Sequence, residues 1–179
     1  MKILVVSDTH GEMPIDIKKM DFDAVMHAGD IGDAAFFGAL NTAAGEKNLY
    51  AVSGNTDFVL SGYLPESISI NIGSLNFFMV HNLTAPHRIL PANESAMNAA
   101  KAEIVVFGHT HTPLVEERGG RIFINPGSLG KVGLTGRRSF AVMENGTPGG
   151  IEIKIFDIDS KEVFISKRFN KINGLFKEI

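Results

Sequence analysis

The chain has 179 residues, of which 44% are hydrophobic, and its 17 basic and 20 acidic side chains give a formal net charge of -3. This size and hydrophobic content predict one globular domain over residues 1–179. The charge balance does not favour tight binding to a nucleic-acid backbone or an anionic membrane. Because the chain contains no cysteine, a disulfide framework, a thiolate zinc site and a cysteine nucleophile are excluded, and any metal ion must be held by oxygen and nitrogen.

The hydrophobic segments are short. The amino-terminal apolar run, Ile3 to Val6, is too short for the core of a signal peptide. No later segment approaches the roughly 18 apolar residues of a membrane span. We therefore expect a soluble, cytoplasmic protein with no membrane partner.

Five apolar runs share one feature, which is that each ends in polar residues of a type common in catalytic sites. We predict a strand for each run, over residues 2–6, 24–26, 49–52, 77–80 and 104–107. The polar tips that follow them are Ser7-Asp8-Thr9-His10, His27-Ala28-Gly29-Asp30, Gly54-Asn55-Thr56-Asp57, His81-Asn82 and Gly108-His109-Thr110-His111.

Between these strands the pattern predicts helices over residues 15–20, 34–44 and 94–101, and such alternation is typical of a parallel sheet with crossover helices. Hairpins are predicted for 67–72 with 75–80, turning at Gly73-Ser74, and for 114–118 with 121–125, turning at Gly119-Gly120. Further strands are expected at 139–143, 151–157 and 162–167. The fold class is therefore mixed α/β, with helices outside two packed sheets.

The five polar tips together offer two carboxylates, one amide and four imidazoles. In an open α/β sheet, the loops beyond the carboxyl ends of parallel strands form the usual binding crevice, so we expect these groups to converge. Nitrogen and oxygen ligands together suit Mn²⁺, Fe, Co, Ni or Zn better than Ca²⁺ or Mg²⁺. Seven ligands are too many for one ion with an open position, and they fit two ions that share a carboxylate. The seven are Asp8, His10, Asp30, Asn55, His81, His109 and His111.

Each tip taken alone has a simpler structural interpretation. Asp8-Thr9-His10 is typical of a capped turn, Asn55 of an Asx turn, and His81 of a hydrogen-bonded histidine. His27, which precedes Gly29-Asp30, is better interpreted as a packed strand residue than as a partner of a ligand. The order of the tips and their shared position at strand ends favour the metal site over these alternatives.

In chain order, the motifs are Asp8-x-His10, Gly29-Asp30, Gly54-Asn55-x-Asp57, His81, Gly108-His109-x-His111 and Asn125-Pro126-Gly127-Ser128. This series resembles the calcineurin-like metallophosphoesterase superfamily, and especially its small single-domain bacterial and archaeal phosphodiesterases. The resemblance covers the chain from Asp8 to about Ser139. It implies a four-layer αββα sandwich in which two packed mixed β-sheets are flanked by helices.

The same resemblance implies two divalent metal ions, for which we expect Mn²⁺, with Ni²⁺, Fe²⁺, Co²⁺ or Zn²⁺ as alternatives. The first ion would be held by Asp8, His10 and His111, and the second by Asn55, His81 and His109, with Asp30 bridging both. A hydroxide between the ions would attack the phosphorus atom of a small phosphodiester. Asp30, Asn55 and Asp57 are the expected catalytic residues, and Asp57 would orient an imidazole through its free ring nitrogen.

Two positions depart from the pattern of the relatives. Many relatives have a histidine, suited to protonate a leaving oxygen, where this chain has Thr56, whose hydroxyl cannot act as that acid. His81 is commonly followed by glycine and histidine, and here Asn82, Leu83 and Thr84 follow it, with His87 as a substitute or a surface-loop residue. The fourth motif is thus the weakest match, and Thr56 implies substrates with good leaving groups or another proton donor.

Phosphate contacts are expected from Ser128, Lys131, Arg137 and Arg138, with a solvated loop as the alternative for each. The main alternatives to a small-molecule phosphodiesterase are a nuclease and a protein-interaction scaffold, because a retromer subunit resembles these enzymes in fold. The acidic charge balance argues against a nucleic-acid polymer, and the filled ligand positions argue against a scaffold. Apolar residues at 68–79 and 172–176 suggest a homodimer, although core packing explains them equally well.

Overall fold

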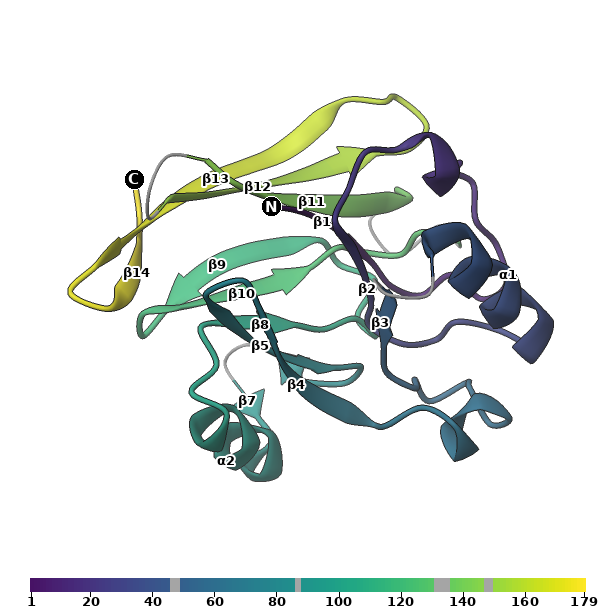
Figure 1. The fold of residues 1–179 in the computed structure, drawn as a ribbon, viewed down its shortest axis with the longest axis horizontal. Helices are drawn as coiled ribbons and strands as arrows, with labels where there is room; N and C mark the ends of the chain where they lie inside the picture. The colour runs from purple at the N-terminus through teal and green to yellow at the C-terminus, as the bar shows by residue number, and fades with distance from the viewer. Residues whose placement is uncertain (46–48, 86–87, 131–135, 147–149) are drawn as a thin grey trace.

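A computed structural model describes residues 1–45, 49–85, 88–130, 136–146 and 150–179 (Figure 1). The helices are α1 (Ala34–Ala44), α2 (Pro91–Ala99) and the short 3-10 helices η1 (Ile17–Lys19) and η2 (Leu60–Gly62). The strands are β1 (Lys2–Val6), β2 (Ala24–His27), β3 (Leu49–Ala51), β4 (Ser67–Ile72), β5 (Leu75–Val80), β6 (Thr84–Ala85), β7 (Arg88–Ile89), β8 (Ile104–Val106), β9 (Leu114–Arg118), β10 (Arg121–Asn125), β11 (Ser139–Asn145), β12 (Gly150–Asp157), β13 (Val163–Ile172) and β14 (Leu175–Glu178).

Two large mixed sheets make up the body of the molecule. Sheet A has the strand order β14-β13-β12-β11-β1-β2-β3, in which β1, β2 and β3 are parallel to one another and β11 pairs antiparallel with β1. Sheet B has the order β4-β5-β8-β10-β9, in which β5, β8 and β10 are parallel. The parallel strands of each sheet therefore lie at its centre or at one edge, and hairpins extend the sheets from there.

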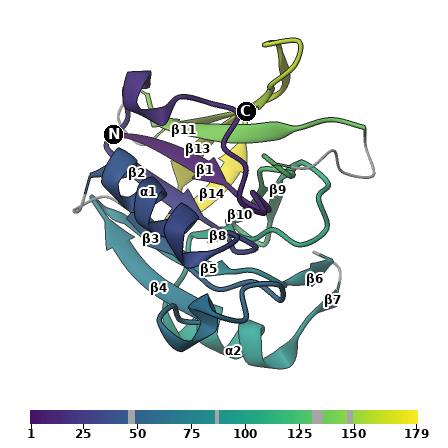
Figure 2. The same ribbon diagram turned by 90° about the vertical axis from the view of Figure 1, so that its right-hand side faces the viewer.

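Alternation along the strands produces four layers, as the sequence predicted. Ile3 of β1 and Phe77 of β5 face the same buried cluster between the two sheets. Leu4 packs instead with Leu40 of α1, and Phe78 packs with Met97 of α2. Figures 1 and 2 accordingly show α1 against β2 and β3, and α2 beyond β4 and β5. Because both faces of the central strands are covered, they are continuous apolar runs in the sequence.

Local sequence signals account for most element boundaries. Helix α1 begins where the Asp33 side chain accepts a hydrogen bond of 2.7 Å from the Phe36 N–H, and it ends at Gly45 with a φ of 80°. Both predicted hairpins occur with the predicted strand limits. The segment predicted as a helix over 15–20 forms only the 3-10 turn η1, and α2 begins three residues earlier than predicted, with Pro91 in its first turn. None of the helices in the described part of the chain combines the length and apolar character needed to cross a bilayer.

Strand β14 was not predicted, and it explains the apolar carboxyl-terminal segment. The hairpin of β13 and β14 folds over the end of the sandwich, where the Phe176 N–H donates to the Gly120 carbonyl of sheet B at 3.1 Å. Lys171 of β13 also forms an ion pair with Glu103. Phe176 is only 1% exposed and belongs to the hydrophobic cluster between the sheets. Part of this segment therefore contributes to the core, and so does the hairpin over residues 68–79. The homodimer suggested by these apolar residues stays a prediction.

Replacing Phe176 with alanine tests whether this hairpin closes the core. The substitution removes a buried aromatic ring, so we expect the free energy of unfolding to fall by about 3–5 kcal/mol. Ile172→Ala is the matched control, because Ile172 lies in the same hairpin but is half exposed, and a change within about 0.5 kcal/mol is expected there. Urea unfolding measures both, and equal effects of the two substitutions would contradict this role of Phe176.

Candidate metal centre

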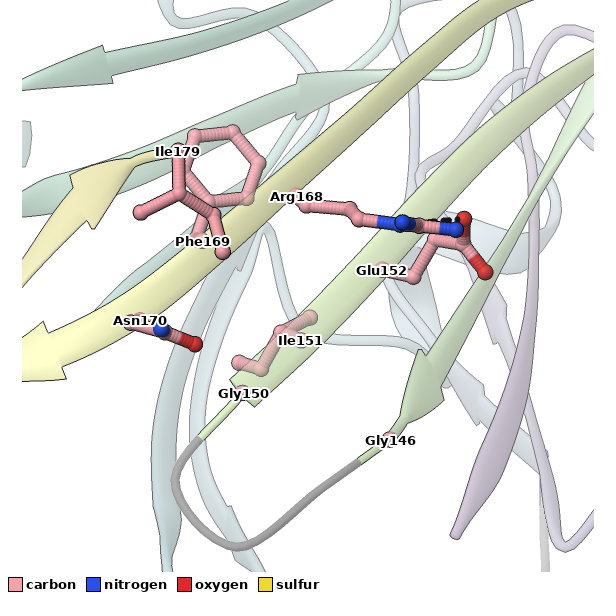
Figure 3. A pocket seen from close by; sticks show the side chains of 8 residues that line it. All are labelled: Gly146, Gly150, Ile151, Glu152, Arg168, Phe169, Asn170 and Ile179. Atoms are coloured by element: carbon pink, nitrogen blue, oxygen red, sulfur yellow. Dashed lines mark hydrogen bonds and ion pairs between the residues drawn. The ribbon is translucent and has the colours of Figure 1, made fainter.

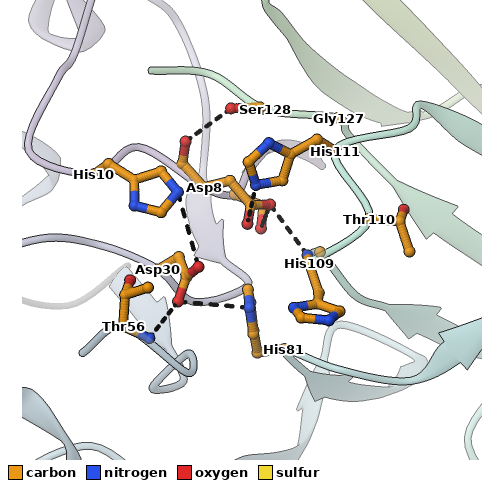
Figure 4. A network of polar contacts seen from close by, with 12 residues as sticks. Asp8, His10, Asp30, Thr56, His81, His109, Thr110, His111, Gly127 and Ser128 are labelled. Carbon is orange, nitrogen blue, oxygen red and sulfur yellow. Dashed lines mark hydrogen bonds and ion pairs between the residues drawn. The ribbon is translucent and has the colours of Figure 1, made fainter. Parts of the chain in front are cut away.

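The carboxyl ends of β1, β2, β3, β5 and β8 meet at one side of the molecule, where the two sheets approach each other. A continuous chain of contacts joins the seven predicted ligands there, and Figure 4 labels all of them except Asn55. The contacts, all between 2.9 and 3.8 Å, link His10 to Asp30, Asp30 to His81, His81 to Asn55, Asn55 to His109, His109 to Asp8 and Asp8 to His111.

Asp8, His10 and His111 form the first group of candidate ligands. One ligand atom of each lies within 4.8 Å of the others, and the two imidazole rings are 5.7 Å apart. Asp8 is fully buried, and its Oδ2 accepts hydrogen bonds from the Ser7 hydroxyl at 2.6 Å and the His109 N–H at 3.2 Å. Its Oδ1 lies 3.2 Å from His111 Nε2 but accepts no well-oriented hydrogen bond within the described part of the chain. A buried carboxylate with one oxygen that accepts no well-oriented hydrogen bond suits a bound cation.

Asn55, His81 and His109 form the second group, and the tautomer of His81 can be deduced. His81 Nδ1 lies 2.7 Å from the Ala28 carbonyl, which can only accept, so Nδ1 carries the proton and Nε2 of the neutral ring carries a lone pair. That lone pair faces Asn55 Oδ1 at 3.0 Å, and His109 Nδ1 lies 2.9 Å from the same oxygen. Two acceptors this close repel each other unless a cation or a proton lies between them, so the donor set fits a metal ion.

Asp30 lies between the two groups (Figure 4). Its Oδ2 is 3.8 Å from His10 Nε2, and its Oδ1 is 3.5 Å from His81 Nε2. The Thr56 N–H donates to Oδ1 at 2.9 Å, which fixes the orientation of the carboxylate. Because each oxygen faces a different group, Asp30 has the placement that a bridging ligand needs.

The backbone of the ligand residues is strained. Asp8, His10, Asp30, His109 and His111 all have φ values between 48° and 67°, a region that residues other than glycine seldom occupy. Only three other non-glycine residues in the described ranges share this property. Such conformations persist only where the surrounding structure holds them, and they concentrate at functional sites. The polar tips are thus sharp reversals of the chain that turn these side chains inward.

The sequence analysis assigned Asp57 to an imidazole, and the structure corrects that role. Asp57 is 1% exposed, and its Oδ1 accepts hydrogen bonds from the N–H groups of Ile31 and Gly32 at 2.8 and 3.1 Å. Its Oδ2 accepts from the Gly54 N–H at 2.8 Å. Asp57 therefore ties the Asn55 turn to the chain that follows Asp30, and it positions two ligand loops through their backbone.

Two buried side chains lie behind the ligands. The Thr9 hydroxyl donates to the Ile31 carbonyl at 2.7 Å, so it must accept from His27 Nε2, which is 2.9 Å away. Burial lowers the pKa of His27 to about 4, which leaves the ring neutral at physiological pH. For Asp8, burial acts to raise the pKa, but the close approach of His111 and the hydrogen bond from Ser7 outweigh it, so the pKa is lowered and the carboxylate is ionised.

The predicted phosphate contacts have other partners where the structure describes them. Ser128 is buried and its hydroxyl donates to the Asp8 carbonyl at 3.0 Å, so it supports a ligand loop rather than facing a substrate. Arg137 lies 3.8 Å from Asp157, and Arg138 pairs with Asp159. Lys131 and His87 lie outside the described residues.

Three supporting residues were not predicted from sequence. Ser7 and Thr9 alternate with the ligands Asp8 and His10, and Asn125 donates to the Gly108 carbonyl at 2.9 Å and the Thr110 hydroxyl at 3.0 Å. The Asn-Pro-Gly-Ser motif was the available signal for Asn125. No comparable signal marked the two hydroxyls, because their partners come from distant parts of the chain.

Another pocket lies away from these residues. A cavity of about 300 Å³ at the edge of sheet A is lined by β12 and β13 residues and Ile179 (Figure 3). Its charged side chains, Glu152 and Arg168, pair with each other at 2.9 Å. It contains none of the predicted ligands, so the strand-end cluster is the candidate site.

Gly108 tests the tight packing around Asp8. A Cβ at this position would overlap the Ser7 hydroxyl and lie 2.8 Å from Asp8 Oδ2, so Gly108→Ala should destabilise the fold by about 1–3 kcal/mol and weaken Mn²⁺ binding about 10- to 100-fold. Gly38→Ala is the control, because Gly38 lies in α1 with open space around it, and the fold should gain up to about 1 kcal/mol. Thermal unfolding and equilibrium dialysis with Mn²⁺ measure the two effects. Unchanged Mn²⁺ affinity in Gly108→Ala would contradict the packing argument.

Comparison with known proteins identifies the family. A phosphodiesterase of Methanocaldococcus jannaschii is 28% identical over 145 residues, which span 71% of this chain and 83% of that protein. Among solved structures, Vacuolar Protein Sorting 29 of Cryptosporidium parvum is similar in fold, with a TM-score of 0.76, 22% identity and coverage of 95% of this chain and 98% of that one. Vps29 of Entamoeba histolytica, solved with Zn²⁺, has a TM-score of 0.73 and 21% identity, covering 95% of this chain and 99% of that one. A family model described as a calcineurin-like phosphoesterase superfamily domain matches residues 1–147, and the chain belongs to this superfamily.

Proposed function

We propose that the protein is a metal-dependent phosphodiesterase that hydrolyses small phosphodiesters at a site for two divalent cations. The observation that carries this proposal is the placement of Asp30, whose two carboxylate oxygens face separate groups of nitrogen and oxygen acceptors. The family uses divalent metals, and phosphodiesterase is the name of the relative from Methanocaldococcus jannaschii. The number of ions and the substrate class are the parts that we propose.

We assign the seven ligands to two cations. Asp8, His10 and His111 would hold one cation, and Asn55, His81 and His109 the other, with Asp30 shared. The donor set of carboxylate, amide and imidazole groups without sulfur favours Mn²⁺, with Fe²⁺, Co²⁺, Ni²⁺ and Zn²⁺ as alternatives. When bound, two such cations would supply a water of low pKa as the nucleophile and would neutralise charge that develops on the phosphoryl oxygens.

The remaining residues of the site position these ligands. Ser7 and the His109 N–H hold one oxygen of Asp8, and Ala28 holds the proton-bearing nitrogen of His81. Thr56 holds Asp30 through its backbone N–H, while its side chain is exposed. A threonine hydroxyl has a pKa far above neutrality and cannot protonate a leaving oxygen, so the proposed substrates carry leaving groups that are stable as anions.

A nucleic-acid polymer fits this surface poorly. Polymer binding relies on basic side chains that track the phosphate backbone. Arg137 and Arg138, two of the expected phosphate contacts, lie near Asp157 and Asp159. The formal net charge of -3 also opposes such binding.

The alternative from another class is a scaffold that binds proteins, as the likeness in fold to Vps29 suggests. Because one Vps29 was solved with Zn²⁺, bound metal would be compatible with either function, and metal content alone does not separate them. Turnover separates them, since a scaffold has no need to hydrolyse any phosphoester.

Asp30→Asn tests the shared carboxylate. The amide keeps the shape of the side chain but cannot bind two cations as an anion, so kcat/KM on bis-p-nitrophenyl phosphate with Mn²⁺ should fall about 100-fold or more. Asp16→Asn, which alters a surface carboxylate paired with Lys19, is the control and should keep wild-type turnover. If wild-type protein gave no metal-dependent turnover on any phosphodiester or phosphomonoester, the proposed function would be wrong.

Thr56 tests the dependence on the leaving group. Wild-type turnover should drop steeply from p-nitrophenyl to alkyl esters, and Thr56→Ala should change it by less than about threefold because the hydroxyl is not the acid. Thr56→His should raise alkyl-ester turnover about 100-fold relative to p-nitrophenyl turnover, which is the lower range for a positioned general acid. A series of aryl and alkyl methyl phosphates measures this. Equal wild-type rates across the series would contradict the inference about Thr56.

A further inference from the structure

The turn that carries Asn55 continues directly into a cluster of exposed apolar side chains. Phe58, Val59 and Tyr63 are 84%, 66% and 83% exposed. The other exposed large hydrophobic residues in the described ranges are aliphatic, and three of them, Ile172, Leu175 and Ile179, lie in the β13–β14 hairpin or directly after it. A single exposed apolar residue needs no explanation, but three within six positions, two of them aromatic, indicate a surface that contacts something.

This segment is held in one conformation although its rings face solvent. Its base is buried, because Asp57 and Leu60 are 1% and 2% exposed. The Ser61 N–H donates to the Asp57 carbonyl at 2.8 Å, and the Ser61 hydroxyl donates to the Phe58 carbonyl at 3.0 Å. Side chains on an ordered segment lose less conformational entropy on binding, so these rings form a preorganised surface.

The cluster is continuous with the candidate metal centre. The Thr56 N–H contacts Asp30 at 2.9 Å, and Phe58 follows two residues later. Because consecutive Cα atoms are about 3.8 Å apart, Phe58 cannot lie farther than about 11 Å from Asn55, Cα to Cα. The segment between β3 and β4 that carries these residues lies at the periphery of the molecule, away from α2 (Figure 1). A substituent on a phosphate held at Asp30 would therefore need to extend only about this far to meet the start of the segment at Phe58.

We propose that Phe58 and Tyr63 form a stacking surface for a planar aromatic substituent of the substrate, such as a nucleobase. Aromatic side chains stack on bases without requiring a particular base, and they bind without the basic residues that a polymer would need. This inference rests on the proposed function and narrows its substrate class to small nucleotide-like phosphodiesters. Phe58 and Tyr63 would act in substrate specificity rather than in the chemical step.

A pair of ligands that differ only in the base tests the proposal. AMP and ribose 5-phosphate share the phosphate and the sugar, so the ratio of their dissociation constants measures the contribution of the base. In Mn²⁺-loaded wild-type protein, isothermal titration should show AMP binding roughly 5- to 100-fold more tightly. Phe58→Ala and Tyr63→Ala should each reduce this ratio while leaving ribose 5-phosphate binding unchanged. Phe58→Tyr should preserve the ratio, and Ile172→Ala, an exposed aliphatic residue in β13, should have no effect.

Equal binding of the two ligands to the wild-type protein would overturn the proposal, as would a ratio that survives both alanine substitutions. A dimer that dissociates in Phe58→Ala, seen by sedimentation velocity with the AMP ratio unchanged, would also overturn it, because the cluster would then be a contact between chains. The titration is independent of turnover. Loss of the ratio in an active enzyme supports stacking, whereas absent turnover with an intact ratio refutes only the proposed function.

Discussion

The candidate site brings together acceptor atoms whose lone pairs repel each other unless a cation or a proton lies between them. His81 Nδ1 donates a hydrogen bond to the Ala28 carbonyl, so in the neutral ring the lone pair of Nε2 faces the acceptor oxygen of Asn55. Asp8 keeps a buried oxygen without a well-oriented hydrogen bond among the described residues, and Asp30 turns its two oxygens toward two groups of imidazoles. A divalent cation in each group would remove the repulsion between these acceptor atoms. The surrounding fold holds the acceptor atoms in this arrangement.

The surrounding chain maintains the cluster through strain and close packing. Five of the ligand residues adopt left-handed backbone conformations, which place their side chains inside sharp reversals after the strands. Gly54 and Gly108 allow neighbouring loops to approach Asp30 and Asp8 where a Cβ would collide. Asp57 then joins the loops of two ligands through three backbone N–H groups. The packing and hydrogen bonds around the site thus offset the cost of the strained backbone and hold the ligands in place, as is common at functional sites.

Much of this could be predicted from sequence, because parallel strands buried on both faces appear as apolar runs and their carboxyl ends share one edge. That geometry allowed all seven candidate ligands to be identified before any contact was known, and turn residues located both hairpins. The roles of Asp57 and Ser128 could not be predicted, since their partners are backbone groups supplied by distant segments. Strand β14 was missed because its short, half-exposed run has no alternation and gains its pairing from β13. The positive φ values could not be predicted from residue type, because aspartate and histidine adopt them more often than most residues but still only rarely.

The proposed mechanism rests on two cations that share the carboxylate of Asp30. A fold of this kind can bind a metal ion without catalysis, whereas the proposed activation of water for attack on phosphorus uses two cations held by one carboxylate. Crystals of the protein grown with Mn²⁺ and measured at the manganese absorption edge test this most directly. The account predicts two anomalous peaks per chain, one beside Asp8, His10 and His111, the other beside Asn55, His81 and His109, with Asp30 bound to both. A single peak, or two peaks that do not share Asp30, would contradict it.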